Sequence, residues 1–247
     1  MTPNIKDPYN IAQQIQPISR PTQFEPNTIK EQINYRKSIE SDNPEMGTSV
    51  FMANVTSLSA HAMEYLFTKQ QHNDIFSIVE TSIVPNRAFY FKRQFEKNNR
   101  KIYSNDGVPS PLGGKAHGGE LLAVKQHLNS MPIDQSILDC IAQQTNSTLR
   151  ISAMTLRIQG MILLIINAYF FDTIGFQHFS NQQIIQQILL LTQIVKLPFL
   201  VHADFNCTPE EVANSGCLSL LFAQLLTPNE ATSKQSDRII DFCLVST

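Results

Sequence analysis

The sequence predicts an α/β protein with one large core, and three observations support that class. The chain has 247 residues, of which 42% are apolar, and this is enough to bury the core of one domain rather than two small ones. Apolar runs of strand length recur along it, as at 74–79, 161–171 and 199–203. Between such runs lie segments whose apolar residues recur at helical spacing. We therefore expect strands and helices to alternate within a single domain.

The composition narrows the possible functions. Only 16% of the residues are charged and the formal net charge is -2, so any binding of nucleic acid depends on a local basic patch. The four cysteines form no C-x-x-C pair, and we expect reduced, buried thiols. The N-terminus has no basic segment followed by an apolar core, and no apolar run reaches about 18 residues. These features predict an intracellular protein, nuclear or cytoplasmic, without a signal peptide or a membrane partner.

The first 47 residues are polar and contain several prolines, so we expect a disordered or loosely attached arm. The folded domain is expected to span 48–247. It begins with a β-branched and apolar segment, Thr48 to Val55, that suits a strand and contains Asn54. Ser59 is a plausible N-cap for a helix that should continue to about Gln71.

Residues 74–81 predict a buried strand that carries Glu80 near its C-terminal end. An acid directly after an apolar run has two explanations. Its side chain can reach solvent where the strand stops, or it can supply a hard oxygen ligand to a divalent cation such as Mg²⁺. The residues alone leave both explanations open.

The segment 84–103 combines basic and aromatic residues, with a single acid, Glu96, among them. Basic side chains between aromatic rings suit contact with phosphates and stacking on bases. The alternative is a solvated edge strand whose alternate aromatic residues face the core. The candidate nucleic-acid-binding residues are Arg87, Lys92, Arg93, Lys97, Arg100 and Lys101.

A glycine-rich stretch, Ser110 to Gly119, lacks the residue order of a phosphate-binding P-loop, so we expect a tight turn that leads into a strand at 120–124. His117 and His127 have no second ligand at metal-binding spacing and are expected at the surface. A helix is predicted near 133–144.

Two apolar strands are predicted next, Leu149 to Ile158 and Met161 to Phe171, joined by a two-residue hairpin turn at Gln159-Gly160. Tyr169 lies near the end of the second strand. Its ring can simply be buried there, or its hydroxyl can form a hydrogen bond with a phosphate oxygen.

Ser180 is a plausible cap for a helix with one apolar stripe, and a buried strand at 199–204 follows it. Asp204 and Asn206 alternate with Phe205, so in an extended chain both would point to one face at the end of that strand. They are either turn-forming residues or a pair of groups for chemistry. Thr208 and Pro209 then predict the start of a helix that should continue to about 226.

The final strand is predicted at 236–246 and contains Asp241 between apolar neighbours. Because burial of a lone carboxylate is costly, Asp241 needs a partner.

Together, these motifs resemble the endonuclease/exonuclease/phosphatase superfamily, which has the DNase I-like fold. The resemblance covers residues 48–247. It consists of motifs in this order: a strand with Asn54, Glu80-Thr81, Gly-Gly at 118–119 before a strand, a strand with Asn-x-Tyr at 167–169, Asp-Phe-Asn at 204–206, and Arg-Ile-x-Asp at 238–241. The Asn-Val-x-Ser-Leu opening at 54–58 is similar to that of the apurinic and retroelement-type endonucleases.

The resemblance implies a four-layered α/β sandwich of two mixed β-sheets flanked by helices. It implies that Glu80 holds Mg²⁺, or Mn²⁺ in its place, with help from Asn54. Asp204 would orient or deprotonate the attacking water, Asn206 would help to position the phosphate, and Tyr169 would contact the phosphate or the leaving oxygen. The acid at Asp241 would support a histidine that touches the scissile phosphate.

Two departures from the family pattern bear on activity. Ala203 stands where the family usually has glycine, and no histidine of a Ser-Asp-His motif follows Asp241 in this sequence. His202 is near the site in sequence, but we do not assign it the missing role. We therefore expect a Mg²⁺-dependent phosphodiesterase, most simply a DNA endonuclease, whose activity is reduced and whose last strand is absent. The alternatives are an inactive nucleic-acid-binding module of the same fold and a phosphatase of the superfamily.

Overall fold

The computed structural model describes residues 47–109, 116–233 and 237–247. The chain divides into two units, 1–47 and 48–247, and every described strand and helix belongs to the second unit. The predicted N-terminal arm up to residue 46, the first part of the glycine-rich stretch, 110–115, and Ser236 lie outside the described residues. None of the helices in the described ranges is both long enough and apolar enough to cross a lipid bilayer.

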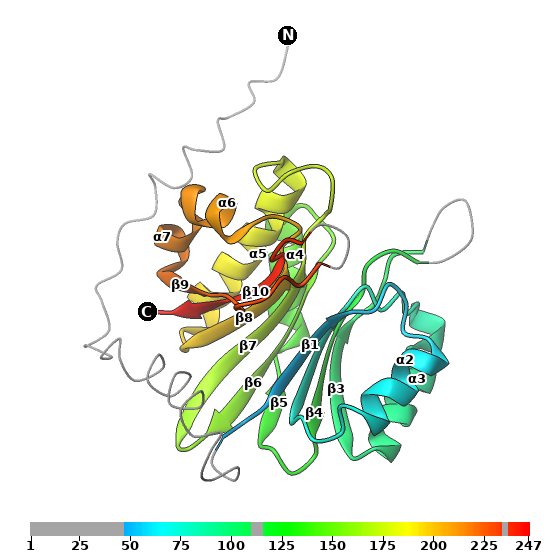
Figure 1. Ribbon diagram of the computed structural model, residues 1–247. Coiled ribbons are helices and arrows are strands. Elements are labelled where there is room, and N and C mark those ends of the chain that lie inside the picture. The colour runs from blue at the N-terminus through cyan, green and yellow to red at the C-terminus, as the bar shows by residue number, and fades with distance from the viewer. Residues whose placement is uncertain (1–46, 110–115, 234–236) are drawn as a thin grey trace. The chain divides into compact units, whose positions relative to one another are not determined.

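Two mixed β-sheets pack face to face, and helices cover the outer face of each (Figure 1). This is the four-layered α/β sandwich that the resemblance implied. The first sheet has four strands in the order β1-β2-β4-β3, and α2 and α3 cover it. Its elements are β1 (Val50–Asn54), α2 (Ala60–Thr68), β2 (Ile75–Val79), α3 (Pro85–Lys97), β3 (Arg100–Asn105) and β4 (Glu120–Lys125).

The second sheet has six strands in the order β5-β6-β7-β8-β10-β9, and α4 and α5 cover its outer face. Strands β7 and β8 are parallel, while β10 is antiparallel to both of its neighbours, β8 and β9. Its elements are β5 (Ser130–Pro132), α4 (Gln135–Thr145), β6 (Ile151–Ile158), β7 (Met161–Tyr169), α5 (Phe179–Val195), β8 (Phe199–Asp204), α6 (Pro209–Asn214), α7 (Cys217–Leu221), β9 (Ala223–Leu226) and β10 (Asp241–Ser246).

The core is divided among the spaces between these layers. A large cluster that includes Ile166, Ile188 and Phe205 fills the space between the second sheet and its helices. A second cluster, with Phe76 and Phe95, lies between the first sheet and α2 and α3. A smaller third cluster joins the inner faces of the two sheets. The side chains of each strand alternate between two buried faces. The sequences of the strands are therefore nearly continuous apolar runs.

Several local predictions are confirmed. Ser59 caps α2 by accepting a hydrogen bond from the Ala62 nitrogen at 3.1 Å. Gln159 and Gly160 both have positive φ, 47° and 84°, as the tight turn between β6 and β7 requires. Thr208 forms a capping box with Glu211 at the start of α6.

The N-terminus of α5 corrects one prediction. The cap is His178, whose ring Nδ1 accepts a hydrogen bond from the Ser180 nitrogen at 3.2 Å, and Ser180 itself lies within the helix. A histidine is an unusual cap, because Ser, Thr, Asp and Asn are strongly preferred there.

The edge-strand interpretation of 84–103 is wrong for most of that segment. Residues Pro85–Lys97 form α3, and only the part from Arg100 onward enters a strand, β3, at the edge of the first sheet. Phe91 and Phe95 are four residues apart, so both reach the same buried face of the helix. Aromatic residues favour strands in general, and tertiary packing outweighed that preference here.

The long helix predicted after Thr208 is also wrong. The chain forms α6, turns at Gly216 with φ of 81°, continues as α7, and ends as the strand β9. Gly216 permits this left-handed turn at little cost, so the helix stops there even though the apolar pattern continues.

The cysteines are free, as predicted, but not all of them are buried. Cys207 and Cys217 are buried, Cys243 is half-buried and Cys140 is exposed on α4.

Candidate active site

The predicted site residues lie where strands of both sheets end at a common edge. Strands β1 and β2 are parallel, and Asn54 is paired with the last residue of β2, so Glu80 follows directly beside it. In the second sheet, Tyr169 at the end of β7 is the partner of Asp204 at the end of β8. Asp241, the first residue of the antiparallel β10, is the other partner of Asp204. The pairing of strands therefore gathers five predicted residues at one edge.

Two hydrogen bonds join these residues across the gap between the sheets. The Asn54 side-chain nitrogen donates to Asp204 Oδ2 at 2.9 Å, although the two residues are 150 positions apart. The Tyr169 hydroxyl donates to Glu80 Oε1 across 89 positions. The structure therefore brings Glu80 and Asp204, which come from different sheets, into one connected cluster.

Asn206 belongs to the same cluster but not in the way the sequence suggested. Strand β8 ends at Asp204, and Asn206 has a left-handed backbone with φ of 52° instead of an extended one. Its backbone nitrogen donates to Asp204 Oδ1 at 3.1 Å, and its side-chain nitrogen donates to the Phe170 carbonyl at 2.8 Å. The turn after β8 thus donates a backbone hydrogen bond to the Asp204 carboxyl.

Backbone strain is concentrated at this edge. Four residues other than glycine have left-handed φ here: Thr56 (54°), Glu80 (55°), Ser82 (53°) and Asn206 (52°). Such conformations cost on the order of 1 to 3 kcal/mol each and cluster at functional sites. For Thr56 the cost is greatest, because a β-branched side chain crowds the backbone in this region.

The Asp204 carboxyl is only 3% exposed. Burial, together with repulsion from Asp241 and Glu80, raises its pKa to about 7, while the hydrogen bonds from Asn54 and Asn206 oppose the shift. A carboxyl with a pKa in this range can accept a proton from water near neutral pH.

Asp241 and Tyr169 are affected by the same surroundings. Burial raises the pKa of Asp241, and a hydrogen bond with the Thr232 side chain opposes that rise, which identifies Thr232 as the polar partner that the sequence required. Burial and the hydrogen bond to Glu80 raise the pKa of Tyr169, so its phenol stays protonated and acts as a donor.

Arg150 is a residue of this site that the sequence interpretation missed. It directly precedes β6, and its Nε donates to the Tyr169 carbonyl at 3.0 Å. The guanidinium lies 4.6 Å from the centroid of the Tyr169 ring and 4.0 Å from that of the Phe171 ring. An isolated arginine at the start of a strand carries no motif, so only the pairing of β6 with β7 reveals its position.

A magnesium ion fits the donor set at the ends of β1 and β2. Glu80 offers a carboxylate and Asn54 an amide oxygen, both hard oxygen ligands, and neither side chain is fully buried. Among the described residues, no three Asp, Glu, His or Cys side chains form a cluster that could hold a metal ion. Mg²⁺ usually keeps several waters and is bound through one or two carboxylates.

His202 faces the same inner surface as Asp204 but lies deeper between the sheets. It is 2% exposed, and burial lowers its pKa to about 4, so the imidazole is neutral. Its strand partner Asn167 donates to the Ile78 carbonyl of β2 at 2.8 Å and so ties the two sheets together below the site. Asn167 and His202 are both buried, at 1% and 2% exposed.

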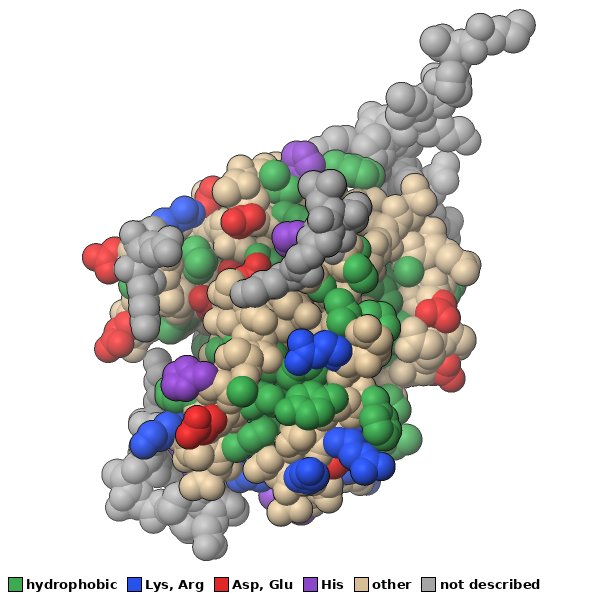
Figure 2. Space-filling model, turned by 90° about the vertical axis from the view of Figure 1, so that its right-hand side faces the viewer, with side chains coloured by type: hydrophobic (Ala, Val, Ile, Leu, Met, Phe, Trp, Pro, Cys, Tyr) green, Lys and Arg blue, Asp and Glu red, His purple; other side chains and the backbone are tan. Residues whose placement is uncertain are grey.

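The basic and aromatic residues of 84–103 divide into an exposed set and a structural set. On the outer side of α3, the side chains of Arg87, Phe89, Tyr90, Lys92 and Arg93 are exposed, and we call this set the α3 surface. The Arg93 guanidinium lies 5.0 Å from the centre of the Phe89 ring. Figure 2 looks at the side of the second unit that carries α2 and α3, and it shows apolar side chains between Lys and Arg side chains. Lys97 is also exposed, whereas Lys101 is half-buried and donates to the Leu128 carbonyl at 3.3 Å.

Arg100 has a structural role, which corrects its place among the nucleic-acid-binding residues. It is 3% exposed, and its guanidinium donates to the carbonyls of Gln71, Asn73 and Asp74 at 3.3, 2.6 and 3.1 Å. It also lies 3.6 Å from the centroid of the Phe76 ring. A side chain held in this way is not available to a phosphate.

The fold is similar to those of several solved structures. The human Nocturnin catalytic domain with bound sulfate matches with a TM-score of 0.56 and 17% identity, over 81% of this chain and 82% of that chain. The AP endonuclease LMAP from Leishmania major matches with a TM-score of 0.56 and 11% identity, over 83% and 80%. The endonuclease domain of TRAS1, a telomere-specific non-LTR retrotransposon, matches with a TM-score of 0.54 and 13% identity, over 80% and 83%.

At the level of sequence, no protein-family model and no curated protein matches the chain. The similarity is therefore one of fold, and it agrees with the resemblance drawn from the motifs. With its two facing mixed sheets and their covering helices, this chain has the DNase I-like fold.

Proposed function

We propose that this chain is a Mg²⁺-dependent phosphodiesterase that acts on nucleic acid, most simply as a DNA endonuclease. The observation that carries the proposal is the connected cluster of Asn54, Asp204, Tyr169 and Glu80, in which two hydrogen bonds join strand ends of both sheets. Strained backbone at Glu80 and Asn206 supports it, because such strain persists where a site needs it.

Each residue of the cluster has a chemical role in the proposal. Glu80 and Asn54 hold the metal ion, for which Mn²⁺ can substitute, and the bound ion offsets negative charge on the phosphodiester. Asp204 orients the attacking water and accepts its proton, as a pKa of about 7 allows. Asn54 and Asn206 fix the orientation of the Asp204 carboxyl through their hydrogen bonds.

The remaining groups position the phosphate. The Tyr169 hydroxyl donates to Glu80, and it can donate to a phosphate oxygen instead when substrate is bound. Of the three guanidinium nitrogens of Arg150, only Nε has a hydrogen-bond partner among the described residues, so the two terminal nitrogens can face a phosphate. Asp241 lies beside Asp204 and helps to keep the pKa of that carboxyl high.

Removal of the metal ligand tests the proposal directly. We expect the chain to nick supercoiled plasmid in Mg²⁺ but not in EDTA, and Glu80→Gln to raise the Mg²⁺ concentration needed for half-maximal rate by at least about tenfold. Glu210→Gln, which neutralises an exposed acid at the start of α6, is the matched control and should behave as wild type.

Other outcomes of that experiment identify the alternatives. Binding of DNA that is independent of Mg²⁺ and without cleavage would show a non-catalytic nucleic-acid-binding module. Release of phosphate from inositol or lipid phosphates, with plasmid left intact, would show a phosphatase.

The α3 surface is expected to add affinity for the nucleic-acid backbone. The double substitution Lys92→Ala with Arg93→Ala should weaken binding of a DNA duplex about tenfold at low salt and should reduce the slope of log affinity against log salt by about two. Fluorescence anisotropy at several salt concentrations measures both quantities. Arg157→Ala, at an exposed position of the other sheet, is the control and should leave the slope unchanged. An unchanged slope in the double variant would remove the α3 surface from the interface.

A further inference from the structure

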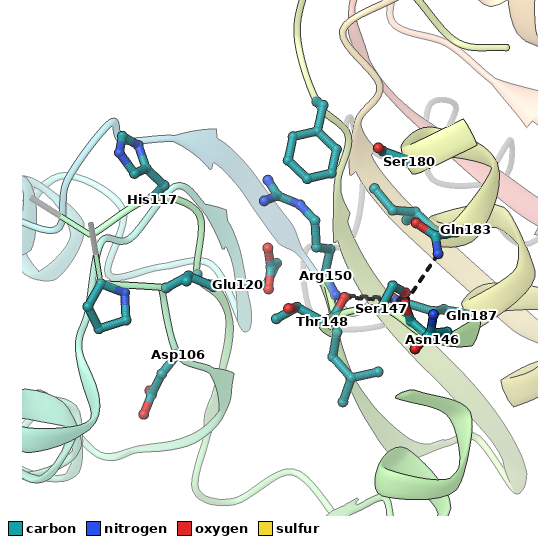
Figure 3. A pocket seen from close by; sticks show the side chains of 16 residues that line it. Asp106, His117, Glu120, Asn146, Ser147, Thr148, Arg150, Ser180, Gln183 and Gln187 are labelled. Atoms are coloured by element: carbon teal, nitrogen blue, oxygen red, sulfur yellow. Dashed lines mark hydrogen bonds between the residues drawn. The ribbon is translucent and has the colours of Figure 1, made fainter. Parts of the chain in front are cut away.

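A pocket of about 430 Å³ lies beside the candidate active site, within the size range of about 300 to 1,000 Å³ that is usual for small-molecule sites. One wall consists of Asp106, which follows β3, His117, which precedes β4, and Glu120, the first residue of β4. The opposite wall consists of Ser180 and Gln183 of α5 together with the segment 146–149. Figure 3 shows Arg150 between the two walls.

Arg150 is shared by the pocket and the site. Its Nε holds the Tyr169 carbonyl, while its guanidinium lies 4.0 Å from the centroid of the Phe171 ring, and Phe171 lines the pocket. Next to it, a Cβ built on Gly118 would lie 3.2 Å from Arg150 Nη1, so the absence of a side chain there lets the guanidinium approach β4. Gly118 and Gly119 accept hydrogen bonds from Ser82 and Thr81, the residues that follow Glu80. A phosphate at Tyr169 and Arg150 is therefore directly adjacent to the pocket.

The walls of the pocket combine a buried acid with a stacking surface. Glu120 is 1% exposed, and burial raises its pKa to about 7, against the opposing effects of Arg150 and the Asn105 hydrogen bond. Such a carboxyl can present a donor as well as acceptors near neutral pH. Phe171 is 38% exposed, and half-buried Leu149 adds apolar surface, whereas Ile184 behind it is only 1% exposed.

The side-chain amides of Gln183 and Gln187 fix the position of the wall that contains the segment 146–149. Gln187 accepts from the Arg150 nitrogen at 3.0 Å and donates to Ser147 and Thr148, and Gln183 donates to the Thr145 carbonyl at 2.8 Å. The shape of the pocket is therefore built into the fold, because α5 holds the segment that leads into β6.

We propose that this pocket receives one unstacked nucleobase, that of the nucleotide whose phosphate is held at Arg150, and this rests on the proposed function. In this proposal a planar base lies between the Phe171 ring and the opposite wall at Leu149, with its hydrogen-bonding edge toward Glu120. A base paired within a duplex cannot enter, so the preferred substrate is single-stranded or frayed nucleic acid.

The absence of tryptophan from the chain allows a direct test. Phe171→Trp introduces a single indole at the pocket, and base stacking should quench its fluorescence when AMP or CMP is added. Ribose 5-phosphate carries the phosphate and sugar without a base, and we expect it to bind at least about fivefold more weakly and to quench little. Phe222→Trp, at a 75% exposed position between α7 and β9, is the control and should respond to neither compound.

Isothermal titration calorimetry on the chain without an introduced tryptophan supplies a second measurement. Phe171→Ala should weaken AMP binding by at least about fivefold and leave ribose 5-phosphate binding unchanged, and Glu120→Gln should alter the preference among AMP, CMP, GMP and UMP. Equal affinity for AMP and ribose 5-phosphate, or an equal response of the Phe222→Trp control, would overturn the proposal.

Hydrolysis of bis(p-nitrophenyl) phosphate, which has no base, separates the failure of this proposal from that of the proposed function. If Mg²⁺-dependent hydrolysis occurs but nucleotides show no dependence on the base, the pocket proposal is wrong and the function stands. If AMP quenches Phe171→Trp but no phosphodiester is hydrolysed, the pocket binds a base and the catalytic function is wrong.

Discussion

Replacement of Asp204 by asparagine is expected to lower the rate of Mg²⁺-dependent phosphodiester cleavage by about 10²- to 10⁴-fold. Asparagine keeps the size of the side chain and can still accept the hydrogen bond from Asn54, but it cannot take a proton from water. Initial rates on plasmid DNA measure the effect. Asp139→Asn, an exposed position on α4, is the matched control and should retain the wild-type rate.

The same substitution should also make the free energy of unfolding less dependent on pH, an effect that a merely misfolded variant would not show. Burial and repulsion from Asp241 raise the pKa of Asp204 to about 7, from about 3.9 in an unfolded chain. The contribution of Asp204 to stability is therefore fully present below about pH 4 and is lost as the pH rises through 7. In metal-free buffer, the free energy of unfolding of wild type should fall between pH 5 and pH 8 by more than that of Asp204→Asn, with a difference of about 2 to 3 kcal/mol.

Either of two results would contradict this account of Asp204. A variant that cleaves at the wild-type rate would show that another group accepts the proton. A variant whose stability has the same pH dependence as wild type would show that the carboxyl does not titrate near neutral pH in the folded chain.

Replacement of Arg100 by alanine is expected to lower the free energy of unfolding by about 3 to 5 kcal/mol. The substitution leaves three carbonyls, those of Gln71, Asn73 and Asp74, without their donor and removes the cation above the Phe76 ring. Burial lowers the pKa of Arg100 to about 10, but the group remains charged at neutral pH. Urea denaturation, followed by circular dichroism, measures the loss.

Two further variants distinguish a structural arginine from one that binds nucleic acid. Arg100→Lys should recover little of the stability, because a lysine cannot span three carbonyls with a planar fork of donors. Lys97→Ala, at an exposed position three residues earlier, should change stability by less than about 0.5 kcal/mol. If Arg100→Ala weakened DNA binding but left stability unchanged, Arg100 would belong to the nucleic-acid interface, as the sequence suggested.

Strand and helix positions were predictable where local chemistry was strong. The strands at β2, β7 and β8 were visible as apolar runs, and the caps at Ser59 and Thr208 marked real helix starts. The errors at 84–103 and at 209–226 arose where local preference and packing disagree. Aromatic residues in α3 suited a strand by propensity, and a continuous apolar pattern after Thr208 hid the left-handed turn at Gly216.

For the candidate site, too, the sequence predicted some features and left others to the tertiary structure. Glu80, Tyr169, Asp204, Asn206 and Asp241 could be selected from the sequence because polar groups at the ends of apolar strands need a reason to be there. Their roles stay predictions until the variants are measured.

The sequence by itself determined the α/β class, most of the strands, and the set of polar residues at the strand ends, because these depend on periodicity and on neighbours along the chain. Only the tertiary structure decided which residues meet. Strand pairing placed Arg150 beside Tyr169, burial converted Arg100 from a candidate ligand into a structural donor, and the turn at Asn206 held Asp204 in place. The physical reason is that hydrogen bonding and burial depend on distances in space, which local sequence patterns do not encode.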